Sequence, residues 1–183
     1  MTETADDQDA QVPDDGRAVQ VLLDDWARFV WWGTDGDVDR VATADGQVLT
    51  WATVDACRRH ARQAGWSAAP TGPSADVAAE DTVDGRSVQT WLNRPGMPLD
   101  PVAGLTLWNL QWDLVATRTG AYPPLNSVQA RCHRKLTVAN IPWLAGVDTY
   151  RPRWTAAELR CLRAALGTAV HTVRAALRPE SRT

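Results

Sequence analysis

The sequence predicts an α+β fold in which a small antiparallel sheet of three or more strands packs against about four helices. Between residues 28 and 51, short β-branched and aromatic runs alternate with turn residues, which is typical of strands. Residues 101–119 and 155–178 instead carry apolar side chains at helical spacing behind capping residues. Ten tryptophans spread along the 183 residues supply the large apolar surfaces that a packed core needs.

The N-terminal residues 1–15 are expected to form a disordered tail, because six of them are acidic and almost none is apolar. Residues 16–179 are expected to form a single domain, since a chain of this length can bury a core without disulfides or a structural metal. The three cysteines are irregularly spaced and form no disulfide framework. No apolar run approaches the ~20 residues of a membrane span, and no secretion signal is recognisable. We therefore expect a cytoplasmic protein.

The first element is predicted to be a helix that Asp15-Gly16 caps. Its apolar side chains recur at i, i+3, i+4 and i+7, which is the spacing of one helix face. These positions are Val19, Leu22, Leu23 and Trp26.

A strand over residues 28–32 and a hairpin over residues 38–51 are predicted to follow. The hairpin turns at Asp45-Gly46, a pair that favours the left-handed backbone of tight β-turns. Thr53 is a suitable N-cap for the next helix, which we expect to end at Gly65.

Residues 66–87 are rich in small and polar residues and are predicted to form a long loop. Residues 87–92 could add one more strand. Asp100 and Pro101 then start a helix that Gly120 ends. This helix is apolar over most of its circumference, which indicates a central position in the core. Its apolar residues are Leu105, Leu107, Trp108, Leu110, Trp112, Leu114 and Val115.

The last third is predicted to hold a short strand at residues 136–139 and a long C-terminal helix. Thr155 and Glu158 have the spacing of a capping box, and Trp154 with Leu159 that of a hydrophobic staple. The apolar stripe of the helix consists of Leu159, Leu162, Leu166, Val170, Val173 and Leu177.

Two cysteine–histidine pairs are candidates for metal ligands or catalysis. Cys57 and His60 lie one helical turn apart, and Cys132 and His133 are adjacent, but the spacings match no standard zinc pattern. Core packing explains Cys57 better, so we expect no metal. Cys132 is flanked by Arg131 and other basic residues that would lower the pKa of a catalytic thiol. The alternative is a basic surface turn with an incidental thiol, because no third catalytic group is identifiable.

Asn109 and Asp113 form a polar strip on the most apolar helix, beside Trp108 and Trp112. A carboxylate on such a helix needs a partner or a raised pKa. Either this strip belongs to a tryptophan-lined ligand pocket, or it is a solvent-facing seam or a buried ion pair.

The basic residues near position 133 suggest a solvated face or a site for an acidic protein partner, rather than a nucleic-acid site. They are Arg131, His133, Arg134, Lys135, Arg151 and Arg153. The chain has a net charge of −3, and no DNA- or RNA-binding motif is recognisable, so nucleic acid is not an expected partner. Phosphate-binding loops and common hydrolase motifs are also missing, and we expect no cofactor and no catalytic residue.

Four segments give the chain a resemblance to the small cytoplasmic immunity proteins of bacterial polymorphic-toxin systems. They are residues 29–33, the hairpin leading into residues 48–57, residues 107–114 and residues 153–159. The resemblance implies a bacterial binding protein that blocks a cognate toxin and has no catalysis of its own.

The sequence thus leaves two hypotheses. The first is a non-enzymatic protein-binding module, an immunity or inhibitor protein, anchored by exposed tryptophan or arginine. The second is a small enzyme or ligand-binding protein with a pocket around Asn109 and Asp113. The predicted binding residues are Trp108, Asn109, Trp112, Asp113, Arg131, Cys132 and His133.

Overall fold

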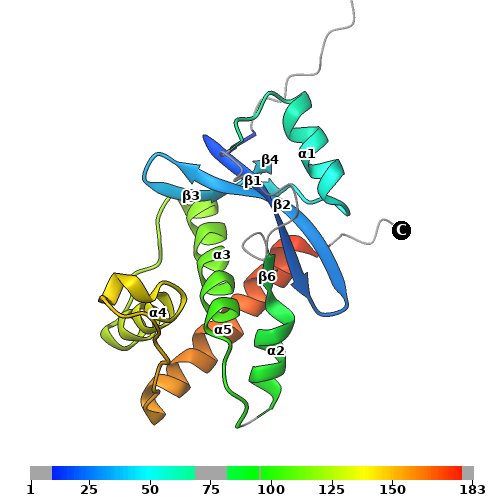
Figure 1. The fold of residues 1–183 in the computed structure, drawn as a ribbon. Coiled ribbons are helices and arrows are strands. Elements are labelled where there is room, and N and C mark those ends of the chain that lie inside the picture. Colours follow the sequence, from blue (N-terminus) through cyan, green and yellow to red (C-terminus); the bar gives the residue numbers. More distant parts are fainter. Residues whose placement is uncertain (1–9, 69–81, 95, 179–183) are drawn as a thin grey trace, which may run out of the picture. The chain divides into compact units, whose positions relative to one another are not determined.

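The computed structural model describes residues 10–68, 82–94 and 96–178, and the account that follows concerns these residues. They form an α+β fold with five α-helices, a four-stranded sheet and a two-stranded ribbon (Figure 1), which confirms the predicted fold class. The chain divides into two compact units, which are described separately. Of the described residues, the first unit contains 10–21, 27–68 and Thr82, and the second contains 22–26, 83–94 and 96–178.

The four-stranded sheet has the order β3-β2-β1-β6. Its strands are β1 (Asp15–Leu23), β2 (Trp26–Asp35), β3 (Val38–Val41) and β6 (Thr82–Asp84). Strand β2 contains the predicted strand at residues 28–32 and pairs antiparallel with β3 from Trp32↔Val41 to Asp35↔Val38.

The two-stranded ribbon confirms the hairpin predicted at Asp45-Gly46. Strand β4 (Thr43–Ala44) pairs antiparallel with β5 (Gln47–Val48). Asp45 and Gly46 have φ values of 52° and 72°, the positive values that a type I′ turn requires at both central positions.

The predicted first helix is wrong, because residues 15–23 form strand β1. Val19, Val21 and Leu23 alternate with less buried residues, so the segment also fits the two-residue period of a strand. The apolar residues of this segment fit both the helical and the strand spacing, so their pattern alone does not exclude a strand. Backbone pairing with a neighbouring strand on each side stabilises the extended form.

In the first unit, helix α1 (Val54–Gln63) packs on the sheet residues through a cluster of buried side chains. The Thr53 side chain accepts a hydrogen bond from Ala56 N, and Gly65 follows the helix with a φ of 72°, as predicted. Cys57 is fully buried in the cluster, which confirms its expected core position. The buried members are Ala18, Phe29, Trp31, Ala42, Cys57 and Ala61.

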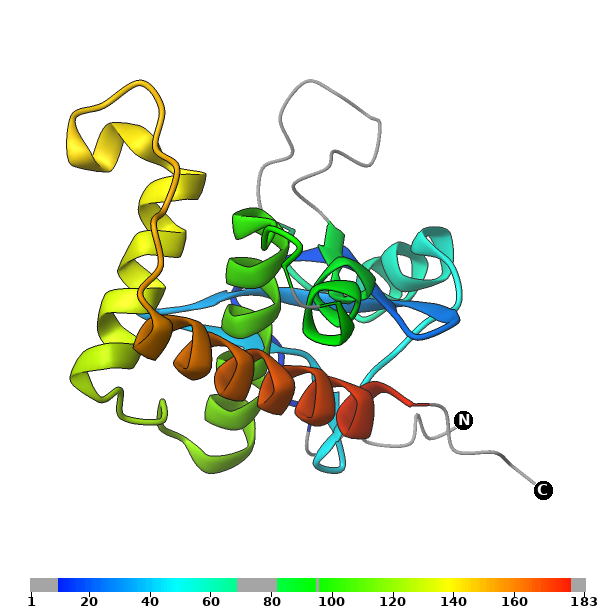
Figure 2. The same ribbon diagram turned by 90° about the horizontal axis from the view of Figure 1, so that it is seen from below.

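In the second unit, the predicted central helix is α3 (Pro101–Thr119), which packs against α2 (Gly85–Asn93), α4 (Ser127–Asn140) and α5 (Ala156–Leu177) (Figure 2). Asp100 caps its first turn, and Gly120 ends it in the left-handed conformation. Both features confirm the prediction. Capping residues act over a few neighbouring positions, so they can be recognised in the sequence.

The capping box of Thr155 and Glu158 opens α5, and most of its predicted stripe is buried. Leu159 is the exception, because this residue is exposed to solvent. The buried members are Leu162, Leu166, Val170, Val173 and Leu177.

Two predicted short strands are helical instead. Residues 87–92 lie in α2, where Val88 and Trp91 are buried one turn apart and Asp84 caps the helix. Residues 136–139 lie in α4, which begins with a capping box formed by Asn126 and Gln129. In both segments, a few β-branched and apolar residues favour a strand when the sequence is considered alone. The helices are stabilised instead by their N-caps, which lie before these segments, and by the burial of one helix face.

Parts of the predicted tail and loop lie outside the described residues, namely 1–9 and 69–81. The described remainder is folded: Gln11 exchanges backbone hydrogen bonds with Thr43, and residues 82–84 form β6. Among the helices of the described ranges, none is long and apolar enough to cross a membrane.

Candidate interaction surface

Four of the predicted binding residues meet where α3 packs on α4. Asn109 Oδ1 lies 2.9 Å from His133 Nε2 and accepts a hydrogen bond from it. The Trp112 ring stacks on the His133 ring at 4.8 Å between centroids and an interplanar angle of 18°. Trp108 meets His133 edge-on at 5.6 Å. Side chains from α3 and α4 therefore form one aromatic cluster.

This cluster is closely packed. Each ring contacts its neighbours, so protein side chains already fill the space that a ligand stacked on these rings would need. His133 is half-buried, and burial lowers its pKa below the ordinary value of 6.5. Tyr122, which the sequence analysis did not single out, extends the cluster at 6.5 Å from Trp112.

Arg131 and Cys132 do not join this cluster, because they face α5. Arg131 Nε lies 3.4 Å from Glu158 Oε1, and Lys135 Nζ lies 2.9 Å from Glu158 Oε2. The Cys132 thiol donates to the backbone oxygen of Glu158 over 3.8 Å. The predicted set thus divides between two faces of α4.

The buried carboxylate of Glu158 holds this second face together. It accepts a hydrogen bond from the backbone N–H of Thr155 as well as from Lys135. The Thr155 N–H and then the Lys135 ammonium lower the pKa of Glu158. A single side chain therefore caps α5 and ties it to α4.

Cys132 has neither of the environments that the sequence suggested. It is fully buried on a helix rather than in a surface turn. Burial raises the pKa of its thiol to about 12, and the neighbouring Cys161 and Glu158 add to the increase, which outweighs the lowering by Lys135. The thiol is therefore protonated at neutral pH and is a poor nucleophile.

Asp113, the other member of the predicted polar strip, is 4% exposed on α3. The strip is therefore not a solvent-facing seam at this position. Across the described ranges, no group of three or more His, Cys, Asp or Glu side chains is arranged to hold a metal ion.

An exposed apolar knob follows α4 and was not located by the sequence analysis. Trp143 is 74% exposed, Leu144 53% and Val147 42%. The ten tryptophans all lie within the described residues, and the other nine are buried or half-buried. Trp143 is thus set apart from the other tryptophans by its environment.

The knob rests on an ordered turn. Pro142–Ala145 form the short 3-10 helix η2, and Gly146 ends it in the left-handed conformation. The backbone N–H of Gly146 donates to Trp143 O, and that of Val147 donates to Pro142 O. These bonds hold the backbone while the side chains project outward.

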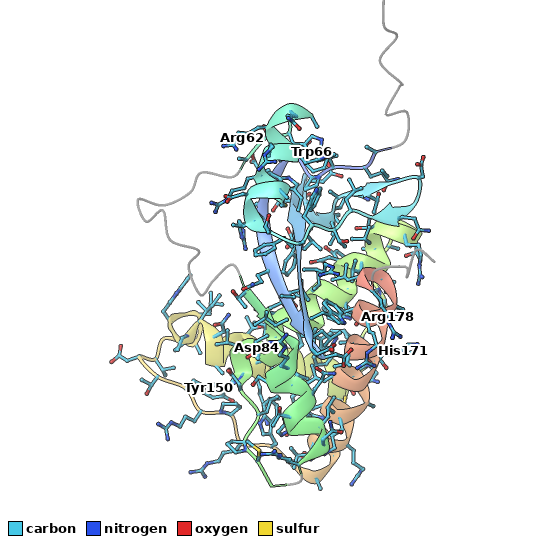
Figure 3. All side chains as sticks on the ribbon, turned by 90° about the vertical axis from the view of Figure 1, so that its right-hand side faces the viewer. Arg62, Trp66, Asp84, Tyr150, His171 and Arg178 are labelled. Carbon is cyan, nitrogen blue, oxygen red and sulfur yellow. The ribbon has the colours of Figure 1, made fainter. Side chains whose placement is uncertain are left out.

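The chain then returns from η2 beside α4, as Figure 2 shows, and Tyr150 marks this returning segment in Figure 3. Lys135 Nζ donates to Arg153 O over 2.7 Å, which fixes the segment on α4. Arg134, Arg151 and Arg153 are exposed, and the described residues supply no partner for their guanidinium groups. We call the α4–η2 surface the set of Trp143, Leu144, Val147, Arg134, Arg151 and Arg153.

A polar groove of about 400 Å³ lies elsewhere in the second unit. Its walls bind one another: Arg86 Nε donates to Asp24 O, and Gln89 Nε2 to Asp24 Oδ1. It is lined by Asp24, Arg86, Gln89, Thr90, Asn93 and Arg94.

Comparison of the chain with known protein families, with curated proteins and with solved structures gives no match. Functional inference therefore depends on the geometry described above.

Proposed function

We propose that this protein is a non-enzymatic protein-binding module that docks an acidic protein partner on the α4–η2 surface. The observation that carries the proposal is the exposure of Trp143, 74%, beside two further exposed apolar side chains. Tryptophan and arginine are enriched among the residues that dominate interface energetics. A large indole left in water by the fold is therefore a natural anchor for a partner.

The backbone of the knob favours binding. Because hydrogen bonds already order residues 142–147, docking need not order a loose loop. Preorganisation of this kind lowers the entropic cost of association. The knob can therefore contribute most of its apolar burial to affinity.

The charge of the surface selects the chemistry of the partner. Between residues 127 and 153 there are five Lys or Arg residues and one acidic residue, Asp148. Arg131 and Lys135 share the carboxylate of Glu158, whereas Arg134, Arg151 and Arg153 face solvent. Exposed arginines on the segments before and after the exposed apolar residues favour an acidic partner and speed its encounter.

Within this class, the resemblance to immunity proteins supports an inhibitor that binds a bacterial toxin. The three free thiols are compatible with a reducing compartment such as the cytoplasm. Inhibition by docking requires no catalytic group of the protein itself.

Site-specific photo-crosslinking tests the proposal and identifies the partner. A benzophenone amino acid replaces Trp143 in the full chain, expressed in its native host. We expect an ultraviolet-dependent adduct with an acidic protein. The matched control places the same group at Met97, an exposed apolar residue on the loop before α3.

The affinity of the identified partner is then measured by calorimetry. We expect Trp143→Ala to weaken binding at least tenfold, roughly 1.4 kcal/mol, while Met97→Ala leaves it unchanged. Both variants should unfold within about 0.5 kcal/mol of the wild type, because exposed residues contribute little to stability. Absence of an adduct, or equal affinity of Trp143→Ala and wild type, would reject the proposal.

A further inference from the structure

Two of the three free cysteines lie on helices that pack against each other in the second unit. Cys132 is on α4 and Cys161 is on α5, whereas Cys57 belongs to the first unit. The Cys132 thiol donates to Glu158 O over 3.8 Å, one turn before Cys161 on α5, and the nearby Cys161 raises the pKa of Cys132. No role in partner docking explains this pairing.

The juxtaposition is fixed by the packing of the two helices. Glu158 and Cys161 are three residues apart on α5 and thus share one face of the helix. Glu158 on that face is held by Arg131 and Lys135, which flank Cys132 on α4. The ion pairs therefore keep the turn that carries Cys161 against Cys132.

The two thiols differ in access to solvent. Cys132 is fully buried, whereas Cys161 is partly exposed. A small oxidant therefore reaches Cys161 more readily than Cys132. This is the arrangement of an accessible thiol with a second thiol poised to resolve its oxidised form.

We propose that Cys132 and Cys161 form a redox modification site that closes into a reversible disulfide when the protein meets a hydroperoxide. The Cys161 thiolate attacks the peroxide O–O bond, gains one oxygen as sulfenic acid, and releases hydroxide. The Cys132 sulfur then displaces that oxygen, forming the S–S bond, and its thiol proton leaves with the oxygen as water. Overall, two thiols lose two electrons and two protons, and one hydrogen peroxide becomes two waters.

The raised pKa of Cys132 gives this site an order of events. Because burial keeps the Cys132 thiol protonated, the first attack belongs to Cys161 and the resolving step is the slower one. Sulfenic acid on Cys161 should therefore accumulate transiently before the disulfide forms. The disulfide would covalently join α4 to α5.

The test treats the reduced full-length protein with hydrogen peroxide, followed by alkylation and non-reducing peptide mass spectrometry. We expect an intramolecular peptide pair that joins Cys132 to Cys161, with the loss of two hydrogens and reversal by dithiothreitol. A rise in Tm on oxidation should accompany it, because a cross-link restricts the unfolded chain. Peroxide-treated protein without this linked pair, in which Cys161 stays a thiol or carries only higher oxidation states, would overturn the proposal.

Three variants keep the result interpretable. Cys57→Ser removes the thiol of the first unit and should leave the linked pair unchanged. Cys132→Ser should leave a sulfenic acid on Cys161 that dimedone traps, and Cys161→Ser should leave Cys132 unmodified. Modification of Cys132 in the Cys161→Ser protein at the wild-type rate would contradict the assigned order. Circular dichroism of the reduced variants checks that each is folded.

Discussion

Trp108 and Trp143 show how the surroundings decide what one kind of side chain does. Trp108 on α3 is buried and packs edge-on against His133 of α4, whereas the side chain of Trp143 on η2 is exposed to solvent. The first contributes to the core through its buried area. The second contributes little to stability and is available to a partner.

His133 makes the stability of the protein depend on pH in the mildly acidic range. Its pKa in the folded protein is lowered from 6.5, so the unfolded chain binds more protons over the window between the two values. We expect the free energy of unfolding to fall as the pH decreases below about 6.5, until it passes the lowered pKa. Urea denaturation followed by tryptophan fluorescence at stepped pH measures this slope.

His133→Gln should flatten the slope in that window, because the group that titrates is gone. The matched control is His171→Gln, which changes an exposed histidine on α5 and should keep the wild-type slope. Equal slopes for His133→Gln and wild type would show that His133 is not the source.

At the level of elements, strand pairing limits which residues the sheet accepts. In the first unit, Gly33 lies where β2 passes β1 closely. A Cβ added there would fall 2.6 Å from Gly16 Cα and even nearer to Asp15 O, both backbone atoms. The absence of a side chain is therefore a requirement of the pairing.

Gly33→Ala is expected to lower the free energy of unfolding by roughly 3 kcal/mol or more, since backbone atoms of β1 must move. Gly36→Ala is the matched control: its added Cβ meets nothing within 4 Å, but its φ of 61° favours glycine. We expect it to cost only about 1 kcal/mol. Chemical denaturation of both variants compares them, and a Gly33→Ala loss no larger than that of Gly36→Ala would refute the close approach.

Across the whole second unit, an ion pair joins residues 150 positions apart in the sequence. Arg174 on α5 donates to both carboxylate oxygens of Asp24 at 2.7 Å, and Gln89 on α2 donates to the same side chain. Arg174 lowers the pKa of Asp24 most, with Gln89 assisting, from 3.8 to about 2. The turn after β1 is thereby connected to two helices.

Asp24→Asn should destabilise the protein by roughly 1 kcal/mol at pH 7, because the pair is partly exposed and screened by water. Since the folded pKa is the lower one, the difference from wild type persists above the ordinary pKa of 3.8. It should shrink as the pH falls from there toward about 2. Urea titrations at several pH values measure it.

Asp25→Asn, at the next position of the same turn, is the control and should stay within about 0.5 kcal/mol of the wild type at every pH. A loss in Asp24→Asn that does not change between pH 7 and the acid range would contradict the ionic origin of the effect.

The candidate site was only partly predictable, for a reason of helix geometry. Asn109 and Trp112 lie on neighbouring turns of α3, so their proximity followed from spacing, and His133 joins them from α4. Adjacent residues on a helix point about 100° apart, because a turn takes about 3.6 residues. Cys132 and His133 therefore face different neighbours, although they are adjacent in the sequence.

The amino-acid order alone determined the mixed fold class, the Asp45-Gly46 hairpin, the span of α3 and the capping box of α5. Each depends on residues a few positions apart, whose backbone preferences act before any tertiary contact forms. Only the folded structure decided that residues 15–23 are a strand, that Trp143 is exposed and that Cys132 packs against α5. These outcomes depend on segments distant in sequence, whose burial and pairing override local periodicity.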